Sequence, residues 1–216
     1  MHRDIDGQLE VVREPSIEVA SGFSRTLVLA SRSPRRAELL AAAGIPFEVL
    51  AADIDETPRE GEAPGAYVER LAIEKARAVL GLRPDAAVLG ADTTVTIDGL
   101  ILGKPVDASE ATAMLRRLQG RAHDVFTGVA LVSTEGVQSA VDRTRVWFNS
   151  MTDEDISWYV ESGEPVDRAG AYAIQGLASR FIPRIDGSYS NVVGLPVALV
   201  SSILRRRKPL RPSPKL

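Results

Sequence analysis

The stretch Leu29-Ala-Ser-Arg-Ser-Pro-Arg-Arg36 decides how this chain is interpreted, because a short apolar strand runs here directly into a helix. Ser33 can act as the N-cap, and Pro34 suits the first helical position, where its missing N–H costs nothing. Arg35 and Arg36 then fall in the first turn, although the helix dipole disfavours cations there. Free backbone N–H groups and two guanidinium groups would together bind an anion, and phosphate is the natural candidate. The alternative is a solvated helix start whose arginines pair with surface carboxylates.

The composition limits the possible functions. A chain of 216 residues, 44% hydrophobic and 25% charged, is ordinary for a globular protein with one sizeable core or two small lobes. The net charge of −3 gives no general basic field, so we expect no specific nucleic-acid partner. The absence of cysteine excludes disulfides and thiolate chemistry, and it is compatible with a cytoplasmic location. With only His2 and His123, any metal site should use carboxylates and a magnesium-like ion.

The two ends of the chain differ in composition from the middle. Residues 1–24 lack the apolar run of a signal peptide, and we interpret them as a loose extension. Residues 206–216 are basic and proline-rich, so we expect a disordered tail that either solubilises the protein or touches RNA or anionic lipid weakly. One domain is expected over residues 25–205. No apolar run approaches the ~18 residues of a membrane span, so we expect no membrane partner.

Alternating strand and helix patterns indicate an α/β fold with a mixed sheet. Expected strands cover residues 26–30, 47–51, 87–97, 100–102, 122–133, 137–148 and 181–185. Expected helices cover 34–43, 64–80, 152–161 and 195–205, with one more from an N-cap at Asp107 to residue 119. Asp98-Gly99 predicts a type I′ hairpin, and Thr152 to Asp155 predicts a capping box.

Carboxylates occur at two unusual places. Asp53-Ile-Asp-Glu56 holds three of them directly after a strand, where open α/β sheets collect ligands, so this loop is either a metal-binding segment or solvated surface. Asp92 lies in the middle of an apolar strand, where aspartate is unfavourable and costly to bury. A lone acid in this position is typical of a site that needs a fixed carboxylate at the edge of a cleft.

Three further side chains are notable in the sequence. The hairpin at Asp98-Gly99 should bring Lys104 back near Asp92. Gln175 lies in a glycine-rich stretch, and its amide can both donate to and accept from the edge of a base. His123 lies near a strand start and is interpreted as a structural histidine rather than a base.

Motifs of other enzyme classes are missing. The chain has no Walker phosphate loop, no Gly-x-Gly-x-x-Gly fingerprint and no Gly-x-Ser-x-Gly elbow, which excludes P-loop hydrolysis, dinucleotide redox and serine esterase chemistry. The remaining inventory of cations and carboxylates suits attack by water on a metal-bound phosphoanhydride.

The segment Ser31-Arg-Ser-Pro-Arg-Arg36 after an apolar strand resembles the opening signature of the Maf-type nucleoside triphosphate pyrophosphatases, and the similarity runs from about Leu27 to about Leu204. The resemblance implies a mixed twisted sheet flanked by helices. It also implies two lobes with nucleotide in a central cleft, as in inosine triphosphate pyrophosphatases, and chains that often pair as homodimers.

The same resemblance implies roles for individual residues. The triphosphate would be held by Ser31, Arg35, Arg36, Lys75 and Lys104. Asp92 would serve as base or metal ligand, and Glu56 would help to bind Mg²⁺ or Mn²⁺. Relatives vary at the position of Asp55, directly before Glu56. The resemblance therefore leaves open whether Asp55 or Glu56 contacts the metal.

The resemblance also narrows the substrate. Relatives that take thymidine and uridine triphosphates have arginine, threonine and glutamine at specificity positions, matched here by Arg35, Thr93 and Gln175. We therefore expect a pyrophosphatase that prefers dTTP and UTP and keeps the nucleotide pool clean. The alternatives are a pyrophosphatase for modified purine triphosphates and a non-catalytic nucleotide-binding regulator of cell division.

Overall fold

The computed structural model describes residues 26–206, so the extension expected at 1–24 and residues 207–216 of the basic tail lie outside the described residues. The strands are β1 (Leu27–Ala30), β2 (Glu48–Val49), β3 (Ala87–Ile97), β4 (Leu100–Leu102), β5 (Ala122–Ser133), β6 (Gly136–Trp147) and β7 (Arg184–Asp186). The helices are α1 (Pro34–Ala42), α2 (Pro64–Leu82), α3 (Ala108–Leu118), α4 (Asp153–Glu161), α5 (Tyr189–Val193) and α6 (Val197–Arg206), with 3₁₀ helices η1 (Ala169–Ala171) and η2 (Leu177–Phe181). None of the helices within residues 26–206 is long and apolar enough to cross a membrane.

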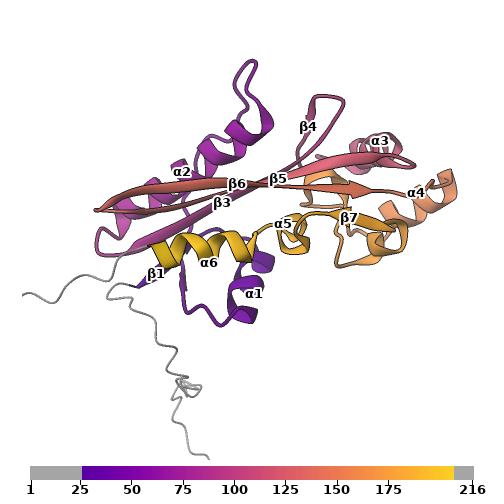
Figure 1. The fold of residues 1–216 in the computed structure, drawn as a ribbon. Helices are drawn as coiled ribbons and strands as arrows, with labels where there is room; N and C mark the ends of the chain where they lie inside the picture. The colour runs from indigo at the N-terminus through magenta and orange to yellow at the C-terminus, as the bar shows by residue number, and fades with distance from the viewer. Residues whose placement is uncertain (1–25, 207–216) are drawn as a thin grey trace, which may run out of the picture. The chain divides into compact units, whose positions relative to one another are not determined.

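The strands form one mixed sheet in the order β2-β1-β3-β5-β6-β7, with β4 paired to β3. β1 is parallel to β2 and β3, whereas the other pairs are antiparallel. Helix α2 covers one face of the sheet, and α1 and α6 cover the other (Figure 1). The predicted mixed sheet flanked by helices is confirmed.

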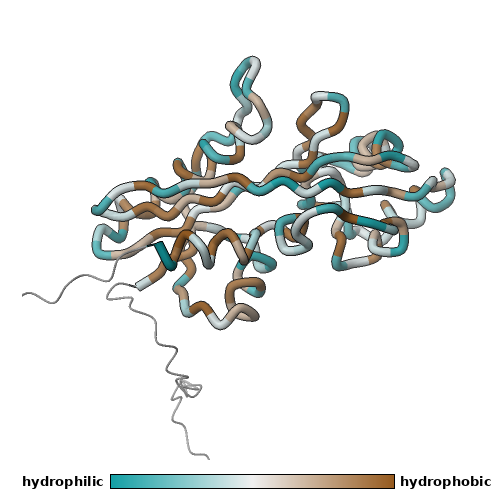
Figure 2. The backbone as a smooth tube through the Cα atoms, in the orientation of Figure 1, coloured by the Kyte–Doolittle hydropathy of each residue, from teal (hydrophilic) through white to brown (hydrophobic). Residues whose placement is uncertain are grey.

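Side chains of the central strands alternate between these two faces, as the period of two in a strand requires. In β3, Leu89 packs in the cluster that holds α1 and α6, whereas Val88 packs in the cluster that holds α2. Hydrophobic residues recur along the elements of both clusters, and hydrophilic residues gather in the loops (Figure 2). By the same alternation, Asp92 faces α2 and Thr93 faces α1, so one strand supplies the site from both sides.

Helix α2 lies unusually close to the sheet because two glycines lie beneath it. A Cβ on Gly90 of β3 would lie 2.0 Å from the backbone oxygen of Ala72, and one on Gly128 of β5 would lie 2.3 Å from that of Val68. The helix backbone therefore rests on the strand backbones with no side chain between them. This close packing sets the height of Lys75 above the sheet.

A separate core cluster lies where β3, β5 and β6 meet α3 and α4, and it includes Leu115, Phe148 and Tyr159. The local signals in this half of the chain are confirmed. Asp98 and Gly99 have φ values of 54° and 75°, as a type I′ turn requires. The Asp107 side chain caps α3, and Thr152 with Asp155 forms the capping box of α4.

Three expectations about local structure are wrong. The strand expected at 181–185 is displaced: residues 177–181 form η2, because the Glu164 carboxylate accepts the N–H groups of Leu177 and Ala178 and stabilises a helical turn. The strand expected at 47–51 is paired only at Glu48 and Val49. Ser33 occupies the N-cap position of α1, but its side chain makes no capping bond.

Candidate functional site

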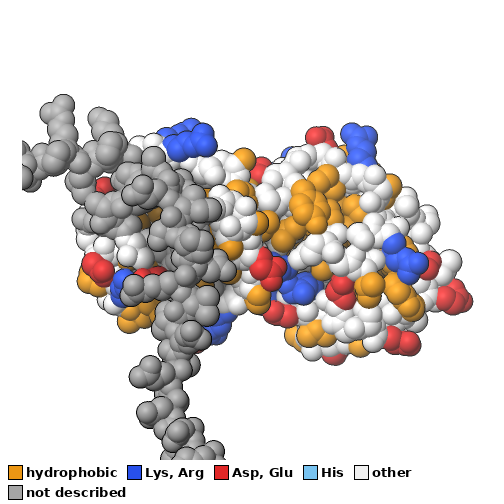
Figure 3. Space-filling view, turned by 90° about the horizontal axis from the view of Figure 1, so that it is seen from below, with side chains coloured by type: hydrophobic (Ala, Val, Ile, Leu, Met, Phe, Trp, Pro, Cys, Tyr) orange, Lys and Arg blue, Asp and Glu red, His pale blue; other side chains and the backbone are white. Residues whose placement is uncertain are grey.

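A pocket of about 400 Å³ opens where α1 begins, β3 crosses the sheet and the segment 167–175 returns beside it. Its size is ordinary for a small-molecule site. Every predicted site residue lines it: Ser31, Arg35, Arg36, Glu56, Lys75, Asp92, Thr93, Lys104 and Gln175. In the space-filling view, basic and acidic side chains lie against one another near the middle of the face that is shown (Figure 3). The pocket therefore joins predicted site residues that are up to 144 positions apart in the sequence, from Ser31 to Gln175.

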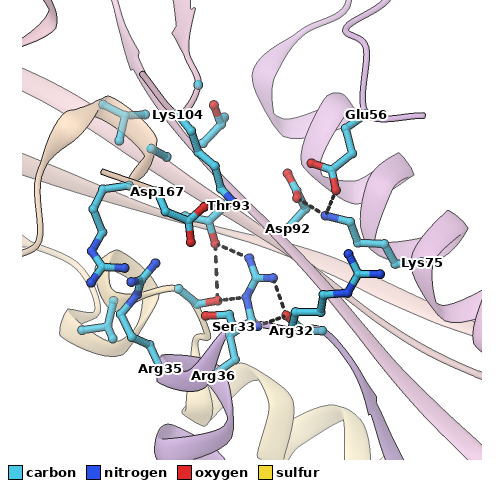
Figure 4. Close-up of a pocket in the computed structure, with 18 of the residues that line it drawn as sticks. Arg32, Ser33, Arg35, Arg36, Glu56, Lys75, Asp92, Thr93, Lys104 and Asp167 are labelled. Atoms are coloured by element: carbon cyan, nitrogen blue, oxygen red, sulfur yellow. Dashed lines mark hydrogen bonds and ion pairs between the residues drawn. The ribbon is translucent and has the colours of Figure 1, made fainter. Parts of the chain in front are cut away.

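Lys75 is the centre of one side of the pocket. Its Nζ lies 2.6 Å from a carboxylate oxygen of Asp92 and 2.8 Å from one of Glu56 (Figure 4). The Lys75 side chain is 13% exposed and that of Asp92 is 10% exposed, so this pair is largely shielded from water. Burial raises the pKa of Asp92, while the charges of Lys75 and Arg36 act against that rise.

Arg36 joins three parts of the chain. Its Nε donates to the Gly194 carbonyl at 2.9 Å, Nη1 donates to the Ser31 hydroxyl at 3.0 Å, and Nη2 donates to the Thr93 hydroxyl at 3.2 Å. The same Ser31 hydroxyl accepts the Ser33 N–H at 3.2 Å. The predicted turn is therefore held by Ser31 and Arg36 rather than by a Ser33 cap. Burial also lowers the pKa of Arg36.

Arg35 differs from Arg36 in having no ion pair or hydrogen bond from its side chain to any other described residue. It extends into the side of the pocket where Lys104 and Asp167 lie (Figure 4). Lys104 lies in the pocket as expected, but its ammonium pairs with Asp167, whereas Asp92 pairs with Lys75. Arg32, the remaining arginine of the turn, pairs with Asp53.

The acidic loop divides its three carboxylates among different partners. Asp53 pairs with Arg32 at 2.8 Å, and Asp55 accepts the Thr57 N–H at 2.9 Å. Asp53 and Glu56 both line the pocket, but of the three loop carboxylates only Glu56 pairs with Lys75.

The described residues contain no group of three metal-ligating side chains. Two carboxylates, Asp92 and Glu56, nevertheless converge on the single cationic nitrogen of Lys75. Magnesium in phosphate-binding sites commonly takes one or two carboxylates and completes its shell with substrate oxygens and water. The donor set therefore fits a divalent cation that is bound together with a phosphate ligand.

His123 is buried and lies behind the pocket. Its Nε2 is 2.8 Å from the hydroxyl of Tyr172, a pocket-lining residue, and Nδ1 has no partner among the described residues. Burial lowers the pKa of His123 to about 4. These contacts support the interpretation of His123 as a neutral structural residue.

This histidine should make stability depend on pH. Between its ordinary pKa of 6.5 in the unfolded chain and about 4 in the folded protein, only the unfolded chain binds the proton, so stability falls as pH decreases through this interval. The expected contribution is roughly 3 kcal/mol. Urea denaturation of His123→Gln between pH 4 and pH 7 should show a correspondingly smaller loss. An unchanged pH dependence would contradict the assignment.

Fold and pocket together define an α/β protein with a cleft lined by arginine, lysine and paired carboxylates. The family model described as Maf-like protein matches residues 26–207, and the chain belongs to this family. The resemblance inferred from Ser31 to Arg36 is thus confirmed.

Several relatives carry the name dTTP/UTP pyrophosphatase. The one from Myxococcus xanthus (strain DK1622) is 57% identical over 180 residues, which cover 83% of this chain and 91% of the relative. The one from Hahella chejuensis (strain KCTC 2396) is 53% identical over 184 residues, which cover 84% and 92%. Among solved structures, the Staphylococcus aureus Ham1 protein aligns at 12% identity with a TM-score of 0.49, covering 85% of this chain and 100% of that one.

Asp167 and Arg168 also line the pocket, although the sequence did not single them out as site residues. Both stand in the glycine-rich stretch from which only Gln175 was selected. A charged pair immediately before Ala-Gly-Ala could have drawn attention to them, but no periodicity showed that the segment returns beside Lys104.

Proposed function

We propose that this protein hydrolyses nucleoside triphosphates to the monophosphate and pyrophosphate, with dTTP and UTP preferred. The supporting observation is the convergence of Asp92, Glu56 and Lys75 in a cation-lined pocket, in a chain about half identical to proteins named dTTP/UTP pyrophosphatase. We also propose that it acts in the cytoplasm, as a homodimer, in removing unwanted nucleotides.

Each side of the pocket has its own task in this reaction. Lys104, Lys75 and the two arginines Arg35 and Arg36 supply positive charge for the triphosphate, with Ser31 holding Arg36 in place. Asp92 orients the attacking water and accepts its proton, for which the burial-raised pKa suits it better than an exposed aspartate.

A divalent cation, Mg²⁺ or Mn²⁺, would be held by Asp92 and Glu56 and would neutralise charge on the phosphates. Glu56 is preferred to Asp55 because only Glu56 reaches Lys75, while the Asp55 carboxylate is engaged with the Thr57 backbone. Lys75 would then move from the carboxylates toward the phosphates, since one position cannot hold both cations.

Base selection is assigned to Gln175, with Thr93 in a supporting role. Gln175 is exposed to the pocket, and its amide can pair with the O4 and N3–H edge of thymine or uracil. The Thr93 hydroxyl is already bonded to Arg36 and lies 2.9 Å from that of Thr127. We propose that Gln175 contacts the base. Thr93 contributes to base selection indirectly, by holding Arg36 and the pocket wall, and Arg35 is the third residue that determines specificity.

Chromatography of the products tests this proposal. Incubation of dTTP, UTP, CTP, dGTP and modified purine triphosphates with Mg²⁺ should give monophosphate and pyrophosphate, fastest from dTTP and UTP. Gln175→Ala should narrow the difference in kcat/KM between UTP and CTP, because a locked amide can reject a mismatched edge by several kcal/mol. Gln138→Ala, an exposed glutamine on β6, is the matched control.

Other product patterns would contradict the proposal. Diphosphate with orthophosphate would mean cleavage at another bond, and the best kcat/KM on a modified purine triphosphate would favour the first alternative. Binding without turnover would favour the nucleotide-binding regulator.

A further inference from the structure

Arg168 is a charged side chain of the pocket that has no role in the reaction proposed above. Arg168 lines the pocket, is half-buried, and has a fully buried Nε with no hydrogen-bond partner. Its side chain makes no ion pair with any other described residue. Its neighbour Asp167 has a carboxylate, but that carboxylate pairs with Lys104 instead.

The backbone around Arg168 is fixed on both sides. Its N–H donates to the Pro165 carbonyl at 3.3 Å, and its carbonyl accepts the Ala171 N–H at 3.0 Å. Gly170 then donates to the Gly103 carbonyl at 3.0 Å, next to Lys104. A Cβ on Gly170 would lie 2.8 Å from a Val95 methyl, so the segment packs directly onto β3. Arg168 is thus held in the wall rather than on a freely moving loop.

A buried guanidinium nitrogen without an acceptor is unfavourable, because it loses hydration and gains no partner, and Arg168 Nε is in this position. Burial lowers the pKa of Arg168, and no neighbouring charge opposes that effect. Natural sites that keep such a group usually use it on a ligand. The ligand should be an anion, since guanidinium groups only donate hydrogen bonds and match phosphate oxygens with two of them.

We propose that Arg168 is a substrate-binding residue that contacts the phosphate chain of the nucleotide. Together with Arg35, which also lacks a partner among residues 26–206, it gives the Lys104 side of the pocket two guanidinium groups whose counter-charge comes from the substrate. The assignment rests on the proposed function for the identity of the nucleotide, but not for the recognition of phosphate.

Arg168→Gln tests this assignment in the full-length protein. The substitution removes the charge and keeps most of the side-chain length, so kcat/KM for UTP should fall roughly 10- to 100-fold, mainly through KM. Titration calorimetry with inorganic tripolyphosphate, in the presence of Mg²⁺, should show a weakening of similar size. Arg77→Gln is the matched control, because Arg77 is exposed on α2 and lies outside the pocket.

The melting temperature separates a ligand contact from a structural role. Replacing the unpaired, half-buried guanidinium of Arg168 by the neutral amide of glutamine should leave Tm unchanged or raise it. Loss of a structural contact would lower Tm. Two results for Arg168→Gln would overturn the assignment. One is an affinity for tripolyphosphate within twofold of the wild type, and the other is a lowered Tm together with parallel losses of affinity for all ligands. If the wild type binds tripolyphosphate but does not hydrolyse UTP, the proposed function fails while the Arg168 contact is still tested.

Discussion

Asp92→Asn is expected to lower kcat by a factor of about 10² or more while the fold and the affinity for nucleotide are retained. The amide keeps the shape of the carboxylate but cannot accept a proton from water or supply its negative charge. Lys75 keeps Glu56 as a partner at 2.8 Å, so its ammonium is not left unpaired. Steady-state kinetics with UTP and Mg²⁺, combined with calorimetry of nucleotide binding, measures the two parameters separately.

Asp153→Asn provides the control for this experiment, because Asp153 is an exposed carboxylate that pairs with Arg116 on the surface. The Asp153→Asn variant loses one negative charge outside the pocket and should keep the activity of the wild type. Turnover by Asp92→Asn close to that of the wild type would remove Asp92 from the reaction. A large loss of Tm would instead mean that the carboxylate is needed for folding.

Gly90→Ala is expected to have the largest effect on stability. The new methyl group would be placed 2.0 Å from the Ala72 carbonyl oxygen, and neither backbone can yield without moving α2 off the sheet. We expect a loss of more than about 3 kcal/mol in the free energy of unfolding, as for severe overpacking. Activity should also fall in the folded fraction, because displacing α2 separates Lys75 from Asp92.

Gly81→Ala, which lies on α2 itself, is the matched change. A Cβ at Gly81 meets no atom within 4 Å, and alanine is the better helix former, so this variant should be stabilised by a few tenths to about 1 kcal/mol. Urea denaturation of both variants gives the comparison. Equal stability of Gly90→Ala and the wild type would show that α2 does not rest on the strand as described.

The parts of the fold that follow local rules could be predicted from the sequence. The limits of β3 and β5 were correct because both are apolar runs bounded by turn residues, and Asp107 and Thr152 mark their helix starts by capping chemistry. Asp92 stood out in an apolar strand, but only the structure shows that it faces α2 on the same side of the sheet as Gly90.

The remaining errors come from contacts between distant segments. The Glu164 carboxylate stabilises a 3₁₀ helix over residues 177–181, and this helix takes in Phe181, the first residue of the strand expected at 181–185. The two adjacent arginines looked equivalent in sequence, but Arg36 is taken up by Ser31, Thr93 and Gly194, while Arg35 stays free of described partners. No local pattern contains this difference, because it depends on where residue 194 returns.

The bond from Arg36 to the Gly194 carbonyl also has a consequence for biosynthesis. The two residues are 158 positions apart, so Arg36 emerges from the ribosome long before its acceptor. During translation the turn from Ser31 to Arg36 lacks this support until residue 194 has been synthesised, although β1, α2 and β3 can already fold. The pocket can be completed only after the segment following α5 has been synthesised, so a chain truncated before Gly194 should lack a competent site even though it contains every strand from β1 to β7.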